Sequence, residues 1–154
     1  MQVVWVTGAG SGLGERLAIN LAVNGAKVIL TGRNLKELER VQRICILAWM
    51  KAVNWEIFKA FVKGWKRLDV ALVFPLDVRD SHVLDAAAAS AEGLLDLPID
   101  MLFCNAGVSS RGSILETPGL SVMDTNLWGA VGLAKAVLPS MLDRESGHIV
   151  AIAG

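Results

Sequence analysis

A cluster of glycines near the start of the chain constrains its fold more than any other feature. Residues 6–14 read VTGAGSGLG, directly after the apolar run QVVWV. Glycine weakens strands and helices, so this cluster indicates that bare backbone is needed between two such elements. A strand, a glycine-rich turn and a helix together form an anion site, because free N–H groups and the positive end of the helix dipole face the turn. A diphosphate fits this site; a purely structural turn is the alternative.

The spacing of these glycines separates two dinucleotide-binding patterns. The pattern GxGxxG fails in both registers, because Leu13 or Glu15 stands where its last glycine belongs. The pattern TGxxxGxG fits, starting at Thr7. The turn alone is a weak signal, and motifs further along the chain have to support it. The cofactor contacts predicted here are Gly8, Ser11, Gly12, Leu13 and Gly14.

Short apolar segments rich in β-branched residues recur along the chain and alternate with helical patterns. The predicted strands are 2–7, 27–31, 70–76, 99–104 and 148–153, and the predicted helices include 13–23, one starting near Leu35, 83–95 and 122–142. Strands that alternate with helices predict an α/β fold with a parallel sheet covered on both faces. We expect a single doubly wound, Rossmann-type domain over residues 1–154, with strand order 3-2-1-4-5. The fold is expected to be incomplete after its fifth strand, whose apolar edge would invite association with another strand.

Residues 44–69 form an atypical insert before the third strand, in which tryptophan and phenylalanine alternate with lysine and arginine. Three interpretations compete: a helical extension packed on the domain, a segment in a membrane interface, or an anomalous segment without a selected role. The apolar residues do not fall on one clean helical face. Packing or anomaly is therefore favoured over membrane binding.

Composition excludes several classes of function. Fifteen basic and fifteen acidic residues cancel, so no global field favours nucleic acid. Cys45 and Cys104 lie outside any CxxC spacing, and the two histidines lack a ligand set, so buried reduced thiols and no metal are expected. We expect no transmembrane span and no signal peptide, and hence an intracellular, cytosolic protein.

The ends of the second, third and fourth strands support cofactor binding. Arg33 follows the second strand where a carboxylate would bind the ribose of NAD, so NADP(H) is favoured over NAD(H), with a solvated arginine as the alternative. After the third strand, Asp77 is placed to accept from the adenine amino group while Val78 packs on the ring; a helix-capping aspartate is the alternative. The fourth strand ends in CNAG, which adds Asn105, Ala106 and Gly107 beside the cofactor.

Together these motifs resemble the short-chain dehydrogenase/reductase family, over nearly the whole chain apart from the insert. Stretches such as VVWVTGAGSGLGERLA, LKELERVQR and AKAVLPSML are most similar to its member 7 group. The resemblance implies hydride transfer between nicotinamide and an alcohol or carbonyl, by an Asn, Ser, Tyr and Lys tetrad, with Asn126 as the asparagine. It further implies a lipophilic alcohol or ketone as substrate in complete relatives, and possible association with the endoplasmic reticulum membrane surface.

The departures from the family pattern bear directly on catalysis. Ala153 and Gly154 stand where the family continues into a serine pair, Cys104 replaces the first asparagine of NNAG, and tyrosine is absent from the 154 residues. Only Asn126 of the tetrad remains. Because a positioned general acid/base contributes roughly 10²–10⁴-fold, we expect this chain to be inactive alone. The alternative is a non-catalytic interaction or regulatory fragment, or a truncated product, that pairs with a complete relative.

Overall fold

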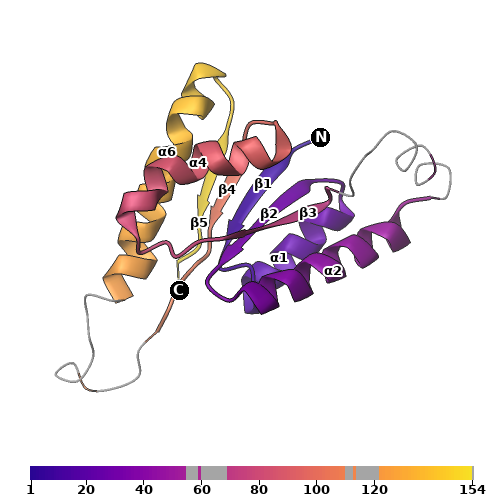
Figure 1. Cartoon of the computed structure of the whole chain (residues 1–154), viewed down its shortest axis with the longest axis horizontal. Helices are drawn as coiled ribbons and strands as arrows, with labels where there is room; N and C mark the ends of the chain where they lie inside the picture. The colour runs from indigo at the N-terminus through magenta and orange to yellow at the C-terminus, as the bar shows by residue number, and fades with distance from the viewer. Residues whose placement is uncertain (55–58, 60–68, 110–112, 114–121, 154) are drawn as a thin grey trace.

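The computed structural model describes residues 1–54, 59, 69–109, 113 and 122–153. Its strands are β1 (Val3–Thr7), β2 (Lys27–Gly32), β3 (Ala71–Pro75), β4 (Met101–Cys104) and β5 (His148–Ala151). Its helices are α1 (Gly12–Val23), α2 (Leu35–Ala52), α4 (Ser81–Leu95), the π-helical turn η1 (Asp124–Trp128) and α6 (Gly129–Asp143). Helices α1 and α2 lie on one face of the sheet, and α4 and α6 lie on the other (Figure 1).

The described strands form a five-stranded parallel sheet in the order β3-β2-β1-β4-β5, which confirms the predicted fold class and strand order. Strand β1 is central, and Trp5 pairs with Ile29 of β2 on one side and with Leu102 of β4 on the other. Since all strands run in one direction, their carboxyl ends meet at one edge of the sheet. The segments with sequence motifs therefore converge there.

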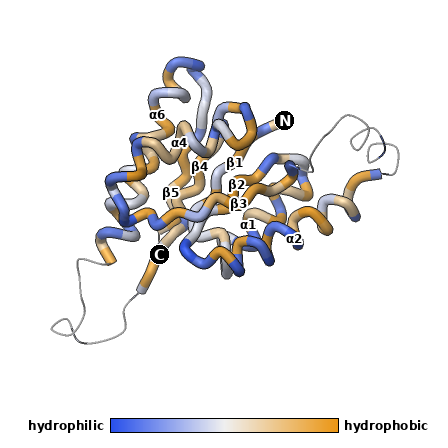
Figure 2. The backbone as a smooth tube through the Cα atoms, viewed as in Figure 1, coloured by the Kyte–Doolittle hydropathy of each residue, from blue (hydrophilic) through white to orange (hydrophobic). Residues whose placement is uncertain are grey.

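Each face of the sheet has its own core, because neighbouring side chains of a strand point to opposite faces. Val3 and Trp5 belong to the core under α4 and α6, whereas Val4 and Val6 belong to the core under α1 and α2. All residues of β1 are buried. Figure 2 shows hydrophobic residues along much of the length of the strands, as expected for strands covered on both sides.

The first residues of the predicted insert continue a regular helix. Helix α2 begins at Leu35, where the Asn34 side chain caps it, and extends to Ala52. Cys45 and Trp49 are buried against the core under this helix, so packing explains Trp49. The rest of the insert, apart from the described positions 53, 54, 59 and 69, lies outside the described residues.

The helix predicted over 122–142 differs from expectation at its start. Residues Asp124–Trp128 form a π-helical turn before α6, and α6 contains Pro139. At the junction, a methyl group on Gly129 would lie 2.7 Å from the side chain of Val78. The absence of a side chain at Gly129 therefore lets η1 approach the loop after β3 closely.

Strand β5 lies at the edge of the sheet and, within the described residues, pairs with β4 alone. Its side chains are exposed or half-buried, and Ile149 is 36% exposed. None of the helices in the described part of the chain combines the length and the apolar character needed to cross a bilayer.

Candidate functional site

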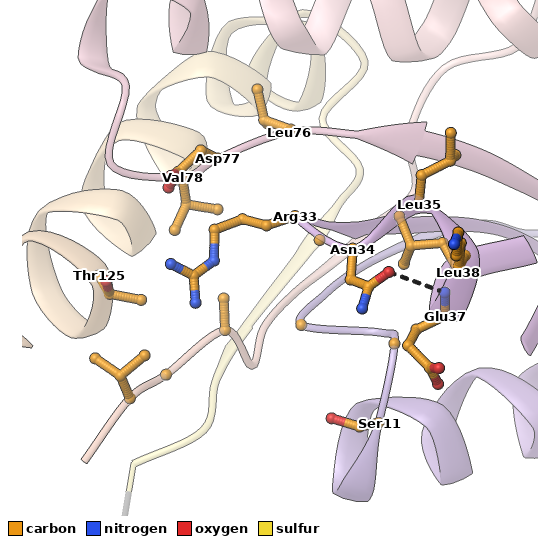
Figure 3. A pocket seen from close by; sticks show the side chains of 17 residues that line it. Ser11, Arg33, Asn34, Leu35, Glu37, Leu38, Leu76, Asp77, Val78 and Thr125 are labelled. Carbon is orange, nitrogen blue, oxygen red and sulfur yellow. Dashed lines mark hydrogen bonds between the residues drawn. The ribbon is translucent and has the colours of Figure 1, made fainter. Parts of the chain in front are cut away.

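A cavity of about 850 Å³ opens at the carboxyl edge of the sheet, where the loops after β1, β2, β3 and β4 meet. Its walls come from the glycine-rich loop, the first turn of α2, the segment after β3 and the segment after β4 (Figure 3). Parallel α/β sheets bind their ligands at this edge. The size falls within the range of roughly 300–1,000 Å³ typical of small-molecule sites.

The cavity brings together most, but not all, of the residues predicted from sequence. Those that line it are Gly8, Ser11, Arg33, Asp77, Val78, Ala106 and Gly107. Gly12, Leu13, Gly14, Asn105 and Asn126 are outside the set of described residues that line it. Gly14, Asn105 and Asn126 instead contact the segments that form the cavity wall.

The glycine loop depends on backbone conformations and close contacts that side chains would prevent. Gly8 and Gly12 have positive φ angles of +64° and +57°. A methyl group on Gly8 would lie 2.9 Å from Cα of Ala106. A methyl group on Gly14 would lie 2.5 Å from Nδ2 of Asn105 and closer still to the carbonyl oxygen of Gly8. Gly14 therefore permits packing of α1 on the loop.

The start of α1 differs from the starts of α2 and α4. Ser11, the N-cap of α1, makes no side-chain capping hydrogen bond, and it lines the cavity. By contrast, Asn34 caps α2 by accepting from the Glu37 amide, and Asp80 caps α4 by accepting from the His82 amide. First-turn N–H groups of a helix need partners, so the uncapped α1 suits an anion.

Thr7 joins the end of β1 to the CNAG segment after β4. Its hydroxyl donates to the carbonyl of Phe103 at 3.1 Å and accepts from the backbone amides of Asn105 and Ala106, each at 3.0 Å. The Asn105 side chain donates back to the carbonyl oxygens of Thr7 and Gly8, at 2.9 and 3.3 Å. Asn105 thus holds the glycine loop, while Ala106 and Gly107 form the cavity wall.

Arg33 lies at the end of β2 and is exposed. Its guanidinium points into the cavity, toward the space between Val78 and Thr125 (Figure 3). The neighbouring Asn34 uses its side-chain oxygen to cap α2, at 3.3 Å from the Glu37 amide. Arg33, the cation at this end of the cavity, therefore directly precedes the N-cap of α2.

Asp77 lines the cavity but is already engaged by Arg79. The guanidinium of Arg79 donates to both carboxylate oxygens, with a shortest distance of 2.6 Å. This pairing with Arg79 lowers the pKa of the Asp77 carboxyl, so Asp77 is an anionic acceptor at neutral pH. The next residue, Val78, is buried and packs against Gly129 at the start of α6.

Asn126 uses its whole side-chain amide to hold the segment after β4. Its Oδ1 accepts from the backbone amide of Val108 at 2.8 Å, and its Nδ2 donates to the carbonyl of the same residue at 2.9 Å. Asn126 lies in the π-helical turn, a feature often found at functional sites. The side chain fixes the position of the cavity wall beside Gly107.

Several cavity residues were missed by sequence reasoning. These are Gly10, Gly32, Asn34, Leu35, Lys36, Glu37, Leu38, Leu76, Val108 and Thr125. Six of them directly flank Arg33 in the sequence: Gly32 on one side and residues 34–38 on the other. Their closeness to the predicted Arg33 could have indicated them. Val108 directly follows the predicted Gly107, whereas Thr125 carries no such signal, because it reaches the cavity only through the packing of η1.

Comparisons with known proteins agree with this geometry. The profile of the short chain dehydrogenase family matches residues 2–154. The chain is 39% identical to mouse dehydrogenase/reductase SDR family member 7 and 38% identical to the human protein, each over 97% of this chain and 40% of the relative. The chain therefore spans less than half the length of these curated relatives.

Solved structures show the same fold. An actinorhodin polyketide ketoreductase variant with NADPH superposes with a TM-score of 0.77 at 29% identity, over 96% of this chain and 51% of the other. A metagenomic short-chain oxidoreductase in complex with NADP superposes with a TM-score of 0.74 at 30% identity, over 96% and 60%. The fold of this chain is thus shared with the superposed part of both structures.

Proposed function

The chain belongs to the short-chain dehydrogenase family, and from this membership we propose that residues 1–154 form one cofactor-binding domain for NADP(H) in alcohol or carbonyl oxidoreduction. One observation carries the proposal: the glycine loop and Arg33 line the same cavity. If Arg33 lay on the far side of the sheet, the glycine loop would lack this cation for contact with the 2′-phosphate of NADP(H).

The glycine loop fits the diphosphate of the cofactor. The first turn of α1 lacks a side-chain cap. Gly8 and Gly12 have positive φ angles that residues with side chains rarely adopt, so glycine leaves the loop backbone open to a ligand. Backbone N–H groups and the helix dipole then stabilise the negative charge. When bound, the nicotinamide of such a cofactor accepts or donates a hydride, whereas the residues of this domain bind and orient it.

Arg33 supports NADP(H) over NAD(H). Its guanidinium faces the cavity at the end of β2, where the ribose of the adenosine half lies in folds of this type. A 2′-phosphate there gains charge-assisted hydrogen bonds from Arg33. Asp77 and Val78 line the same cavity and suit the adenine amino group and ring.

We propose that residues 1–154 alone bind the cofactor without turnover. The sequence contains no tyrosine, the general acid/base of the family pattern. Asn126, the remaining tetrad position, directs its side-chain amide to the backbone of Val108 and positions the cavity wall. A lipophilic alcohol or ketone substrate remains a proposal from the resemblance to the member 7 group.

Titration with both cofactors tests this function. Calorimetry on the purified chain is expected to give tighter binding of NADPH than of NADH, without oxidation of NADPH in the presence of a ketone. Binding of neither dinucleotide would contradict cofactor binding, and turnover would contradict the absence of catalysis. Equal affinities for NADPH and NADH would contradict only the proposed role of Arg33 and leave cofactor binding intact.

The exposed edge of β5 favours a second candidate, a non-catalytic domain that associates through this edge. Strand β5 pairs with β4 alone among the described strands, and Ile149 and Ile152 are 36% and 38% exposed. Unpaired apolar edges recruit further strands. Light scattering on the wild-type chain and on Ile149→Lys tests this: association that Ile149→Lys abolishes supports it, and a monomeric wild type contradicts it.

A further inference from the structure

Arg40 connects the glycine loop, α1 and α2 at the back of the cavity. Its Nη1 and Nη2 donate to the two carboxylate oxygens of Glu15 at 2.8 and 2.7 Å. Its Nε donates to Glu37 at 2.8 Å, and Nη2 also donates to the carbonyl oxygen of Gly10 at 3.2 Å. A single guanidinium therefore ties the first turn of α2 to the glycine loop and the first turn of α1, 25 to 30 positions earlier in the chain.

Of the two carboxylates bound by Arg40, Glu37 lines the cavity, and Glu15 follows the glycine loop without lining it. Glu15 is in the first turn of α1, directly after Gly14 of the glycine loop. Glu37 is in the first turn of α2 and lines the cavity together with Arg33. A methyl group on Gly10 would lie 3.3 Å from Cβ of Glu37, so the loop and Glu37 are in close proximity.

Two carboxylates at this place would repel a ligand that carries several phosphate charges. The Arg40 guanidinium offsets this repulsion, and its hydrogen bonds lower the pKa of the Glu15 carboxyl, which keeps Glu15 anionic and paired. The side chains of Arg40 and Glu15 are 38% and 21% exposed, so solvent screens their fields in part. The expected effect on binding is moderate.

We propose that Arg40 is a positioning residue for phosphate-bearing cofactors: it neutralises Glu15 and Glu37 and holds the Gly10 carbonyl within the glycine loop. This inference rests on the proposed function, since it needs NADP(H) to bind at the loop. Arg40 contacts the loop and the acids from behind the cavity and does not line it. Its role is electrostatic and acts through these three partners.

The test measures NADPH affinity of the full chain by calorimetry for Arg40→Gln and for the triple variant Glu15→Gln/Glu37→Gln/Arg40→Gln. Arg40→Gln leaves two carboxylates unpaired and is expected to weaken NADPH binding by roughly three- to tenfold, with a larger loss at low salt. The triple variant removes the repulsion as well and is expected to restore most of the affinity. A purely structural role predicts no such rescue.

The matched control is Arg43→Gln, which removes the same charge from an exposed position one turn nearer the carboxyl end of α2. Affinity of Arg40→Gln equal to that of Arg43→Gln would overturn the inference while leaving the proposed function intact. So would a triple variant that binds as weakly as Arg40→Gln. If Arg40→Gln fails to fold, the triple variant decides alone. NADPH affinity near that of the wild type would then support the inference, and weak binding would overturn it. A wild-type chain that does not bind NADPH would overturn both proposals.

Discussion

The indole N–H of Trp5 donates a hydrogen bond of 2.8 Å to the hydroxyl of Thr31, and that hydroxyl donates onward to the carbonyl of Phe74 at 2.8 Å. Both side chains are fully buried, and the relay connects β1, β2 and β3 across the sheet. The Trp5 ring also packs edge-to-face on Phe74, with centroids 5.8 Å apart. The relay thus supports the end of β3, just before the cavity segment.

Thr31→Val removes this hydroxyl without changing the size of the side chain much. The Trp5 indole N–H and the Phe74 carbonyl then lack their buried partner, and an unsatisfied buried group costs about 1–3 kcal/mol. We expect the free energy of unfolding in urea to fall by about 2 kcal/mol. Thr31→Ser keeps the hydroxyl and is expected to lose less; equal losses in both variants would argue against the relay.

Gly14→Ala tests the packing of α1 on the glycine loop. The added methyl group would meet the Gly8 carbonyl and Nδ2 of Asn105, so the loop has to move. We expect a loss of about 1–3 kcal/mol in unfolding free energy, and weaker NADPH binding. The matched control is Gly93→Ala in α4, where a methyl group has nothing within 4 Å and is expected to stabilise the helix by roughly 0.5–1 kcal/mol. Equal effects at the two sites would exclude a packing role for Gly14.

Arg33→Ala tests cofactor selection. Hydrogen bonds to charged groups are worth about 1.5–3 kcal/mol, so NADPH affinity is expected to fall by roughly 10- to 100-fold. NADH lacks the 2′-phosphate and serves as the internal control, because its affinity should change little. Calorimetric titration of both cofactors measures the ratio, and a parallel loss of both would indicate damage to the site instead.

Burial is expected to protect both thiols from modification. Burial raises the pKa of Cys45 to about 12 and that of Cys104 to about 11. Thiolate is the reactive form, so the native chain should react slowly with a disulfide reagent at pH 8, whereas both thiols react at once in denaturant. A Cys104→Ser variant assigns the remaining rate to Cys45. Rapid reaction of Cys45 in the native state would contradict its burial.

Stability is expected to fall on acidification. Hydrogen bonds from Arg40 and Arg79 lower the pKa values of Glu15 and Asp77 below their ordinary values of 4.5 and 3.8. A lowered pKa in the folded state stabilises the fold above the unfolded-state pKa, and this contribution is lost as pH falls through the folded-state value. Urea unfolding at stepwise pH from 7 to 3 should show the loss beginning near pH 4.5. Glu15→Gln should have a shallower decline; an unchanged pH profile would contradict the contribution of Glu15.

Local patterns were sufficient to predict much of the fold and part of the site. Apolar segments of strand length that alternate with helical patterns indicated a parallel sheet, and the structure confirms its strand order. The start of the insert was less predictable, since nothing local distinguishes an extended α2 with Trp49 buried beneath it from an irregular segment. The π-helical turn around Asn126 was also missed, because no local pattern marks it. In the structure it precedes Gly129, which packs closely against Val78 from a distant part of the chain.

By itself, the sequence determined the glycine spacing, the alternation of strands with helices and the presence of an arginine directly after β2. These features depend on neighbours within a few positions, where backbone conformation and hydrophobic periodicity act. Only the tertiary structure decided that Asn105 holds the loop instead of lining the cavity and that Arg40 pairs with Glu15 across 25 positions. Such contacts join segments far apart in the chain, and their partners follow from how the sheet and helices pack.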